Sequence, residues 1–107
     1  MDWSVETLNE TVDEELAALP ANMRARFVWI SQLITEHGLE NLGEPYVKHI
    51  EKALWEIRLK GKDGISRALY VTAKPKRVIV VRVFIKKSQK IPRKEIKLAL
   101  KRAEEIE

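Results

Sequence analysis

The chain of 107 residues contains no cysteine and only two histidines. Without cysteine it can form neither disulfide bridges nor a zinc site built on thiolates. The absence of disulfides suits a protein of the cytoplasm, where we expect this one to act. The sequence also lacks a Walker loop, a glycine-rich dinucleotide turn and a Ser/His/Asp spacing. It therefore predicts no metal ion and no small-molecule cofactor.

Long hydrophobic runs are missing as well. No apolar segment approaches the roughly 20 residues that a membrane-spanning helix needs. The first six residues have neither the basic nor the apolar region of a signal peptide, so we expect no membrane contact. The length is near the usual size of one domain, and the sequence shows no repeat or linker. We expect residues 1–107 to form a single domain.

Charge is abundant and unevenly distributed. Residues 1–53 carry ten acidic and four basic side chains, a net charge of −6, whereas residues 54–107 carry sixteen basic and six acidic ones, a net charge of +10. Such asymmetry indicates contact with nucleic acid or a membrane. Arg58, Arg67 and Arg82 lie inside apolar segments, where a charge is costly unless it faces a ligand or a partner. This pattern predicts a cationic surface on a sheet, with RNA as the first candidate ligand.

The N-terminal half predicts a short edge strand at residues 3–5 and then two helices with a very short connection. The first helix starts behind Asn9, a capping residue, and is interrupted by Pro20. The second runs from about Ala21 to Gly38. Apolar residues that recur with helical spacing, and should face the core, are Val12, Leu16 and Leu19 in the first helix and Met23, Phe27, Ile30 and Ile34 in the second.

The C-terminal half predicts three strands and a helix. The strands lie at about 53–60, 65–73 and 77–86, the first two joined by a turn at Asp63-Gly64. Residues 47–50 are expected to form a short helical turn, and the last helix runs from about Pro92 to Glu105. The predicted fold is α+β in the order β-α-α-β-β-β-α. Its N-terminal strand and helical hairpin pack on a small antiparallel sheet, with Trp29 and Trp55 in the core.

Three stretches carry a resemblance to a known family. They are residues 54–58 (LWEIR), the pair Arg67 and Tyr70, and residues 84–92 (FIKKSQKIP) with Glu95-Ile96. Together they resemble the phage-derived HigB-like toxins of the RelE/ParE superfamily. The resemblance implies a RelE-like, microbial-RNase-like fold over nearly the whole chain. It also implies the toxin of a type II toxin–antitoxin system, an mRNA endoribonuclease whose partners are mRNA on the ribosome and a helix-turn-helix antitoxin of the HigA type.

One position departs from the family pattern. The family often has a histidine two residues before the phenylalanine of the last stretch, and this chain has Arg82 there. An imidazole exchanges protons near neutral pH, whereas a guanidinium does not. Proton transfer must therefore come from another residue, or the activity is weak.

Metal-independent RNA cleavage needs a base for the 2′-hydroxyl, an acid for the departing 5′ oxygen and cations for the transition state. Arginine suits the third task, since its planar guanidinium binds two phosphate oxygens at once. We predict Arg58, Arg67 and Arg82 as phosphate clamps and Lys86 as a further catalytic residue. Either Lys86 or Lys87 can act as a base only if its pKa is lowered, which neighbouring cations would favour. Tyr70 is a candidate for proton transfer, although in a regular strand it points away from Arg67. The lysines expected to bind RNA are Lys60, Lys62, Lys87 and Lys90.

Two questions stay open at this level. Arg82 shares a strand face with Val80 and Phe84, and Arg67 also lies among apolar neighbours. These arginines either extend over the margin of an apolar patch or are buried in ion pairs with Glu56. The alternatives to a nuclease are a non-catalytic toxin of the ParE type, which inhibits DNA gyrase, and an inactive phage-derived remnant that binds nucleic acid.

Overall fold

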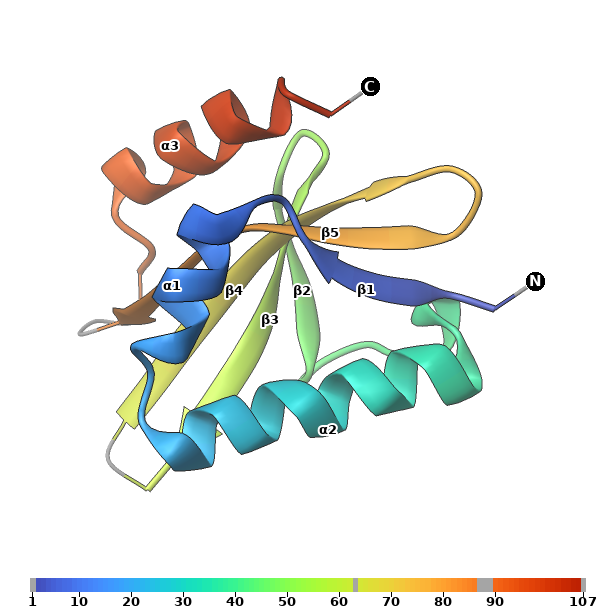
Figure 1. Cartoon of the computed structure of the whole chain (residues 1–107), viewed down its shortest axis with the longest axis horizontal. Coiled ribbons are helices and arrows are strands. Elements are labelled where there is room, and N and C mark those ends of the chain that lie inside the picture. The colour runs from blue at the N-terminus through green and yellow to red at the C-terminus, as the bar shows by residue number, and fades with distance from the viewer. Residues whose placement is uncertain (1, 63, 87–89, 107) are drawn as a thin grey trace.

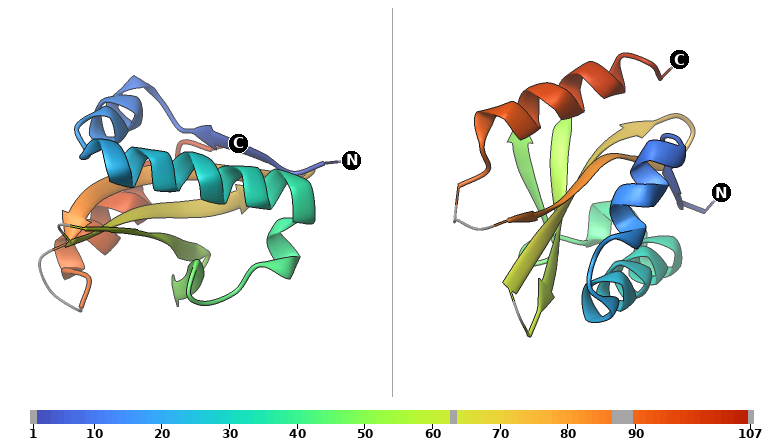
Figure 2. Two further views of the ribbon diagram at one scale, coloured as in Figure 1. Left: turned by 90° about the horizontal axis from the view of Figure 1, so that it is seen from below. Right: turned by 60° about the vertical axis from the view of Figure 1, so that its left-hand side comes forward.

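The computed structural model describes residues 2–62, 64–86 and 90–106. A five-stranded sheet in the order β1-β5-β4-β3-β2 separates α1 and α2 from α3 (Figures 1 and 2). β1 is parallel to β5, and the other neighbouring strands are antiparallel. This arrangement confirms the predicted α+β fold. The elements are β1 (Ser4–Thr7), α1 (Glu10–Ala17), α2 (Ala21–His37), the 3-10 turn η1 (Leu39–Asn41), β2 (Val47–Glu51), β3 (Leu54–Gly61), β4 (Gly64–Ala73), β5 (Arg77–Lys86) and α3 (Arg93–Ala103).

The two N-terminal helices follow the predicted pattern. The side chain of Asn9 caps α1 by accepting a hydrogen bond from the backbone N–H of Val12. Pro20 precedes α2, and Gly38 ends it with a φ of 86°, a conformation that favours glycine. The predicted apolar stripe of α2 is buried against the sheet. Within the described residues, no helix is both long enough and apolar enough to span a membrane.

Residues 47–51 form strand β2 and not the expected helical turn. The observed order is therefore β-α-α-β-β-β-β-α. β2 pairs with β3, with Val47 opposite Ile57 and Lys48 opposite Glu56. Burial of Val47 beneath the α2 side of the sheet stabilises this pairing. The extra strand brings Lys48 beside the basic residues of β3.

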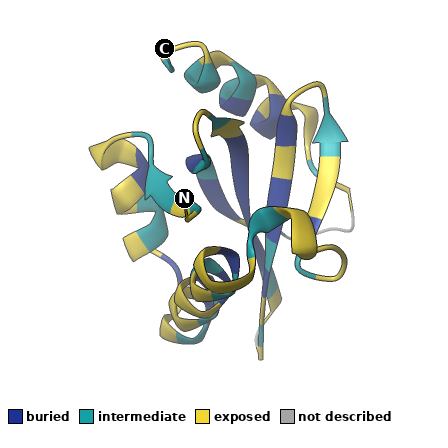
Figure 3. Ribbon diagram, turned by 90° about the vertical axis from the view of Figure 1, so that its right-hand side faces the viewer, coloured by how far each residue is buried: buried dark blue, intermediate teal, exposed yellow. Residues whose placement is uncertain are grey.

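The strands contribute to two separate cores, and the buried positions of the sheet lie between the helical layers (Figure 3). Ile57 and Tyr70 belong to the core under α1 and α2. Leu54, Leu69 and Phe84 belong to the core under α3. Since side chains alternate along a strand, Glu56, Arg58 and Arg67 share the α3 face.

A β-bulge in β5 changes the expected orientation of its residues. Leu69 is opposite Arg82, but Tyr70 is opposite Val80, so that Val81 is the extra residue. Val80 consequently lies in the core under α1 and α2, whereas Phe84 lies in the core under α3. The expectation that Arg82 shares one face with both was wrong, because it assumed a regular strand.

An ion-pair network covers the edge of β5 beyond the end of β1. Glu15 of α1 accepts hydrogen bonds from the backbone N–H of Val83 at 3.0 Å and from Arg82 Nη1 at 2.7 Å. Arg102 of α3 donates to the Val81 carbonyl at 2.9 Å and also contacts Glu15. Arg82 Nε donates to Glu95 Oε1 at 2.8 Å. Arg82 is thus partly buried in ion pairs, but its partners are Glu15 and Glu95 and not Glu56.

Glu15→Ala should lower the free energy of unfolding by about 2–4 kcal/mol. The substitution leaves the Val83 N–H without its acceptor and removes a carboxylate shared by two arginines. Urea denaturation measures the change. Glu14→Ala, on the exposed side of the same helix, is the control and should stay within about 0.5 kcal/mol of wild type. Equal losses in the two variants would contradict a specific role for Glu15.

Candidate active site

A cationic cleft of about 280 Å³ lies on the α3 face of the sheet. It is bounded by β2, β3, the end of β5 and the segment that leads into α3. Arg58, Lys86 and Lys90 of the predicted set meet in this cleft. Its lining residues are Lys48, His49, Ile50, Glu56, Arg58, Lys86, Lys90, Ile91 and Ile96.

A buried carboxylate organises the cations beside this cleft. Arg58 and Arg67 are directly opposite each other on β3 and β4, an arrangement that is unfavourable without a counter-ion. Glu56, which is 2% exposed, accepts a hydrogen bond from Arg58 Nε at 3.0 Å. Its other oxygen, Oε2, lies 2.9 Å from Arg67 Nε. For Arg67 the proposed burial in an ion pair with Glu56 is therefore what the structure shows.

The guanidinium of Arg67 is only partly satisfied. Its Nε is close to Glu56 but is poorly aligned for a hydrogen bond, and its Nη1 has no hydrogen-bond partner among the described residues. Burial lowers the pKa of Arg67 from its usual value, while the Glu56 carboxylate opposes the shift. An arginine stays charged even so. The site therefore holds a buried cation with hydrogen-bonding capacity left over.

Lys86 lies at the end of β5, partly buried and close to this charge cluster. Burial lowers the pKa of Lys86 most, and the nearby Arg67 lowers it further. Arg58 and Lys48 act in the same direction, while Glu56 opposes them. The cationic surroundings that sequence analysis required for a lysine base are therefore present.

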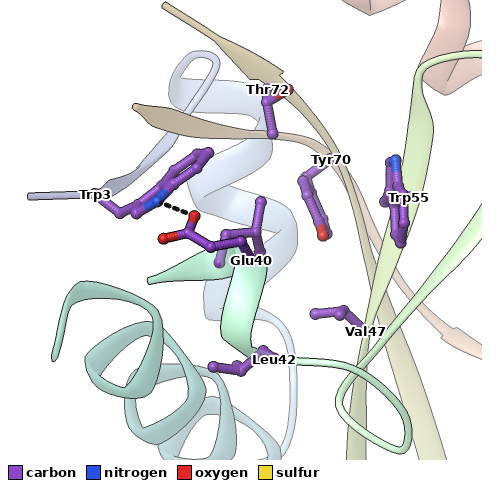
Figure 4. Close-up of a pocket in the computed structure, with 8 residues that line it drawn as sticks. Trp3, Glu40, Leu42, Val47, Trp55, Tyr70 and Thr72 are labelled. Atoms are coloured by element: carbon purple, nitrogen blue, oxygen red, sulfur yellow. Dashed lines mark hydrogen bonds between the residues drawn. The ribbon is translucent and has the colours of Figure 1, made fainter. Parts of the chain in front are cut away.

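Tyr70 and Arg82 are not brought into the cleft. Tyr70 is 1% exposed and lies in the core on the opposite face, as regular alternation predicts. Figure 4 shows its ring between Glu40 and Trp55 in a hollow on that face. Burial raises the pKa of Tyr70 above its usual value, which makes it a poor proton donor or acceptor. The guanidinium of Arg82 is committed to Glu15 and Glu95.

The four lysines predicted to bind RNA have different positions. Lys90 lines the cationic cleft. Lys60 lines a second hollow next to it, and Lys62 is exposed just past the end of β3. Lys87 falls outside the described residues.

Sequence analysis missed Lys48, because residues 47–50 were expected to be helical. The β-branched Val47 and Ile50 were the available signal for a strand. It also placed Trp29 and Trp55 in the core, but these side chains are 40% and 38% exposed. The rings of Trp55 and His49 pack in an edge-to-face arrangement with 5.0 Å between their centroids. His49 lines the cleft, and its Nε2 lies 2.7 Å from the Lys52 carbonyl oxygen.

The described side chains do not form a metal-binding group. Over residues 2–62, 64–86 and 90–106, no three histidine, aspartate or glutamate side chains are placed to share one. The polar side chains that converge at the cleft are mainly cations, which bind anions such as phosphate.

Comparison with known proteins agrees with the architecture. Residues 14–104 match the family described as "Phage derived protein Gp49-like (DUF891)". No curated protein matches. The free E. coli toxin RelE, solved as a double arginine-to-alanine mutant, has a TM-score of 0.64 and 17% identity, with 95% of this chain and 98% of that chain covered. The archaeal RelE–RelB complex from Pyrococcus horikoshii OT3 has a TM-score of 0.57 and 20% identity, with 79% and 96% covered. The chain therefore belongs to the phage-derived Gp49-like family and has the fold of the RelE toxins.

Proposed function

We propose that this protein is the toxin of a type II toxin–antitoxin system and cleaves mRNA on the translating ribosome without a metal ion. The observation that carries the proposal is the buried Glu56, which holds Arg58 and Arg67 together beside a cleft lined by lysines. A surplus of cations around one carboxylate is costly in the free protein. A phosphate group in the cleft would offset that cost.

The two arginines would stabilise the transition state. Arg58 lines the cleft with its side chain about one-third exposed, so its guanidinium can reach a phosphate oxygen. Arg67 lies behind it, buried, and adds a fixed positive charge. Preorganised charges in a site shielded from water are usually the largest single contribution to such catalysis.

Proton transfer would be shared between two lysines. Neutral Lys86 would accept the proton of the 2′-hydroxyl, since its lowered pKa increases its neutral fraction. The 2′ oxygen would then attack phosphorus, and the bond to the 5′ oxygen would break. Lys48 extends from β2, on the other side of Glu56 and Arg58, and would protonate the departing oxygen. The products would be a 2′,3′-cyclic phosphate and a 5′-hydroxyl.

The partners follow from the same proposal. One of the similar structures is a RelE–RelB complex, which supports a protein antitoxin for this chain. We propose a helix-turn-helix antitoxin of the HigA type, encoded next to the toxin gene. The substrate would be mRNA on ribosomes in the cytoplasm, and positioning by the ribosome would compensate for a simply equipped site.

The cleavage rate should rise with pH and level off below the ordinary lysine pKa of 10.5. The reason is that burial and neighbouring cations lower the pKa of Lys86, so it loses its proton at a lower pH than a free lysine. Single-turnover cleavage measured from pH 6 to 9 tests this. In Lys86→Arg the rise should disappear, because arginine keeps its proton throughout. A rise of unchanged size in that variant would assign the titration to another group.

Brief induction in cells separates the nuclease from its alternatives. New mRNA 5′ ends within translated codons, accompanied by growth arrest, are expected. Growth arrest with intact transcripts and DNA breaks would support a gyrase inhibitor of the ParE type. Intact transcripts without growth arrest would support an inactive remnant.

A further inference from the structure

We propose that the hollow next to the cationic cleft is a second phosphate subsite, which binds the phosphate adjacent to the scissile one. This second hollow has a volume of about 230 Å³ and is lined by Pro45, Arg58, Lys60, Ile65 and Arg67. The inference rests on the proposed nuclease function and extends it. It assigns Lys60 as a binding residue and the substrate as an RNA strand with at least two phosphates in contact with the protein.

The charge of the second hollow is not balanced by the protein. Arg58 and Arg67 share one carboxylate, that of Glu56. Among residues 2–62, 64–86 and 90–106, no carboxylate lies within ion-pair distance of Lys60. Two arginines and a lysine thus meet with a single counter-ion, and an anion from outside would complete the site.

The buried guanidinium of Arg67 is the second observation. Arg67 is 3% exposed, and its Nη1 lacks a hydrogen-bond partner in the described part of the chain. A buried donor without a partner costs roughly 1–3 kcal/mol. Such an unpaired donor in a native structure calls for an explanation, and a functional role is one. Since the side chain lines the second hollow, its positive charge would attract a phosphate bound there.

The spacing of the two sites suits successive phosphates. Glu56, Arg58 and Lys60 occupy alternate positions on the same face of β3. Alternate residues of a strand are about 6.6 Å apart, a step that an extended RNA strand can match between neighbouring phosphates. Arg58 lines both the cleft and the second hollow, so it would contact both phosphates. Pro45 and Ile65 provide apolar walls against which a ribose can pack.

The test uses a 2′-O-methyl trinucleotide, which cannot be cleaved, and two forms of it with one of the two linkages replaced by a neutral methylphosphonate. Binding to the purified protein is measured at low salt. For wild type, either neutral linkage should weaken binding about tenfold, as loss of a charge-assisted contact predicts. Lys60→Met should weaken the charged trinucleotide similarly. In Lys60→Met, neutralising the linkage whose phosphate occupies the second hollow should not weaken binding further. Neutralising the other linkage should still weaken binding about tenfold.

In Lys86→Met, neutralising the linkage whose phosphate occupies the cationic cleft should not weaken binding further, whereas neutralising the other linkage should. Lys101→Met, on the exposed surface of α3, is the control and should bind all three trinucleotides within twofold of wild type. Two results would refute the second subsite. One is that Lys60→Met loses the same affinity for both partly neutral trinucleotides, and the other is that wild type binds all three trinucleotides equally well. Neither result would affect the proposed cleavage on the ribosome, because the mapping of mRNA 5′ ends in cells detects cleavage independently of Lys60.

Discussion

Lys86→Met is expected to lower the rate of mRNA cleavage about 10²–10⁴-fold, the usual contribution of a general base. Methionine keeps much of the length of the lysine stem but can neither accept a proton nor carry a charge. Because Arg67, Arg58 and Lys48 repel Lys86 and only Glu56 opposes them, its removal relieves more repulsion than it loses attraction. The free energy of unfolding should therefore stay within about 1 kcal/mol of wild type.

The variant Lys86→Arg distinguishes the role of Lys86 as a base from its role as a positive charge. It retains a cation at the end of β5 but has no neutral form to act as a base. The cleavage rate should fall about as far as in Lys86→Met, while binding of a non-cleavable RNA stays within a few-fold of wild type. Lys101→Met serves again as the surface control. Substantial cleavage by Lys86→Arg would show that Lys86 contributes only electrostatics.

Glu56→Ala is expected to lower the free energy of unfolding by about 3–5 kcal/mol, the cost of breaking a buried ion pair from one side. Arg67 is 3% exposed and would keep its charge with no carboxylate beside it. Arg58 would lose its hydrogen bond at the same time. The variant should thus unfold at much lower urea concentration.

A double-mutant cycle identifies the cause. Glu56→Ala combined with Arg67→Met should be clearly less destabilised than the sum of the two single variants, because the uncompensated charge is removed. Additive losses, or a loss under about 0.5 kcal/mol in Glu56→Ala, would contradict the ion pair. The same contact means that Arg67→Ala alters stability and cleavage together, so Lys86 is the better probe of catalysis.

Much of the fold could be predicted from signals that involve only neighbouring residues. The Asn9 cap, the break at Pro20 and the glycine end at Gly38 depend on a few neighbouring residues, and all three are observed. The three longer strands were also found, since their apolar runs and turns are local signals. Alternation along a strand further predicted that Tyr70 points away from Arg67, which the structure shows.

The remaining features depend on contacts between distant segments. β2 is a strand because β3 lies beside it, and Lys48 reaches the cleft only through that pairing. The bulge at Val81 exists only relative to β4. Arg82 was assigned to phosphate, but its partner Glu15 is 67 residues away. No periodicity in a single sequence indicates which carboxylate will reach such an arginine.

The most direct test of the central claim is to incubate the purified protein with ribosomes translating a defined mRNA and to analyse both ends of any product. We expect cleavage within codons, with a 2′,3′-cyclic phosphate upstream and a 5′-hydroxyl downstream, and loss of these products in Lys86→Met. Intact mRNA under these conditions, or products that carry a 5′-phosphate, would contradict the central claim.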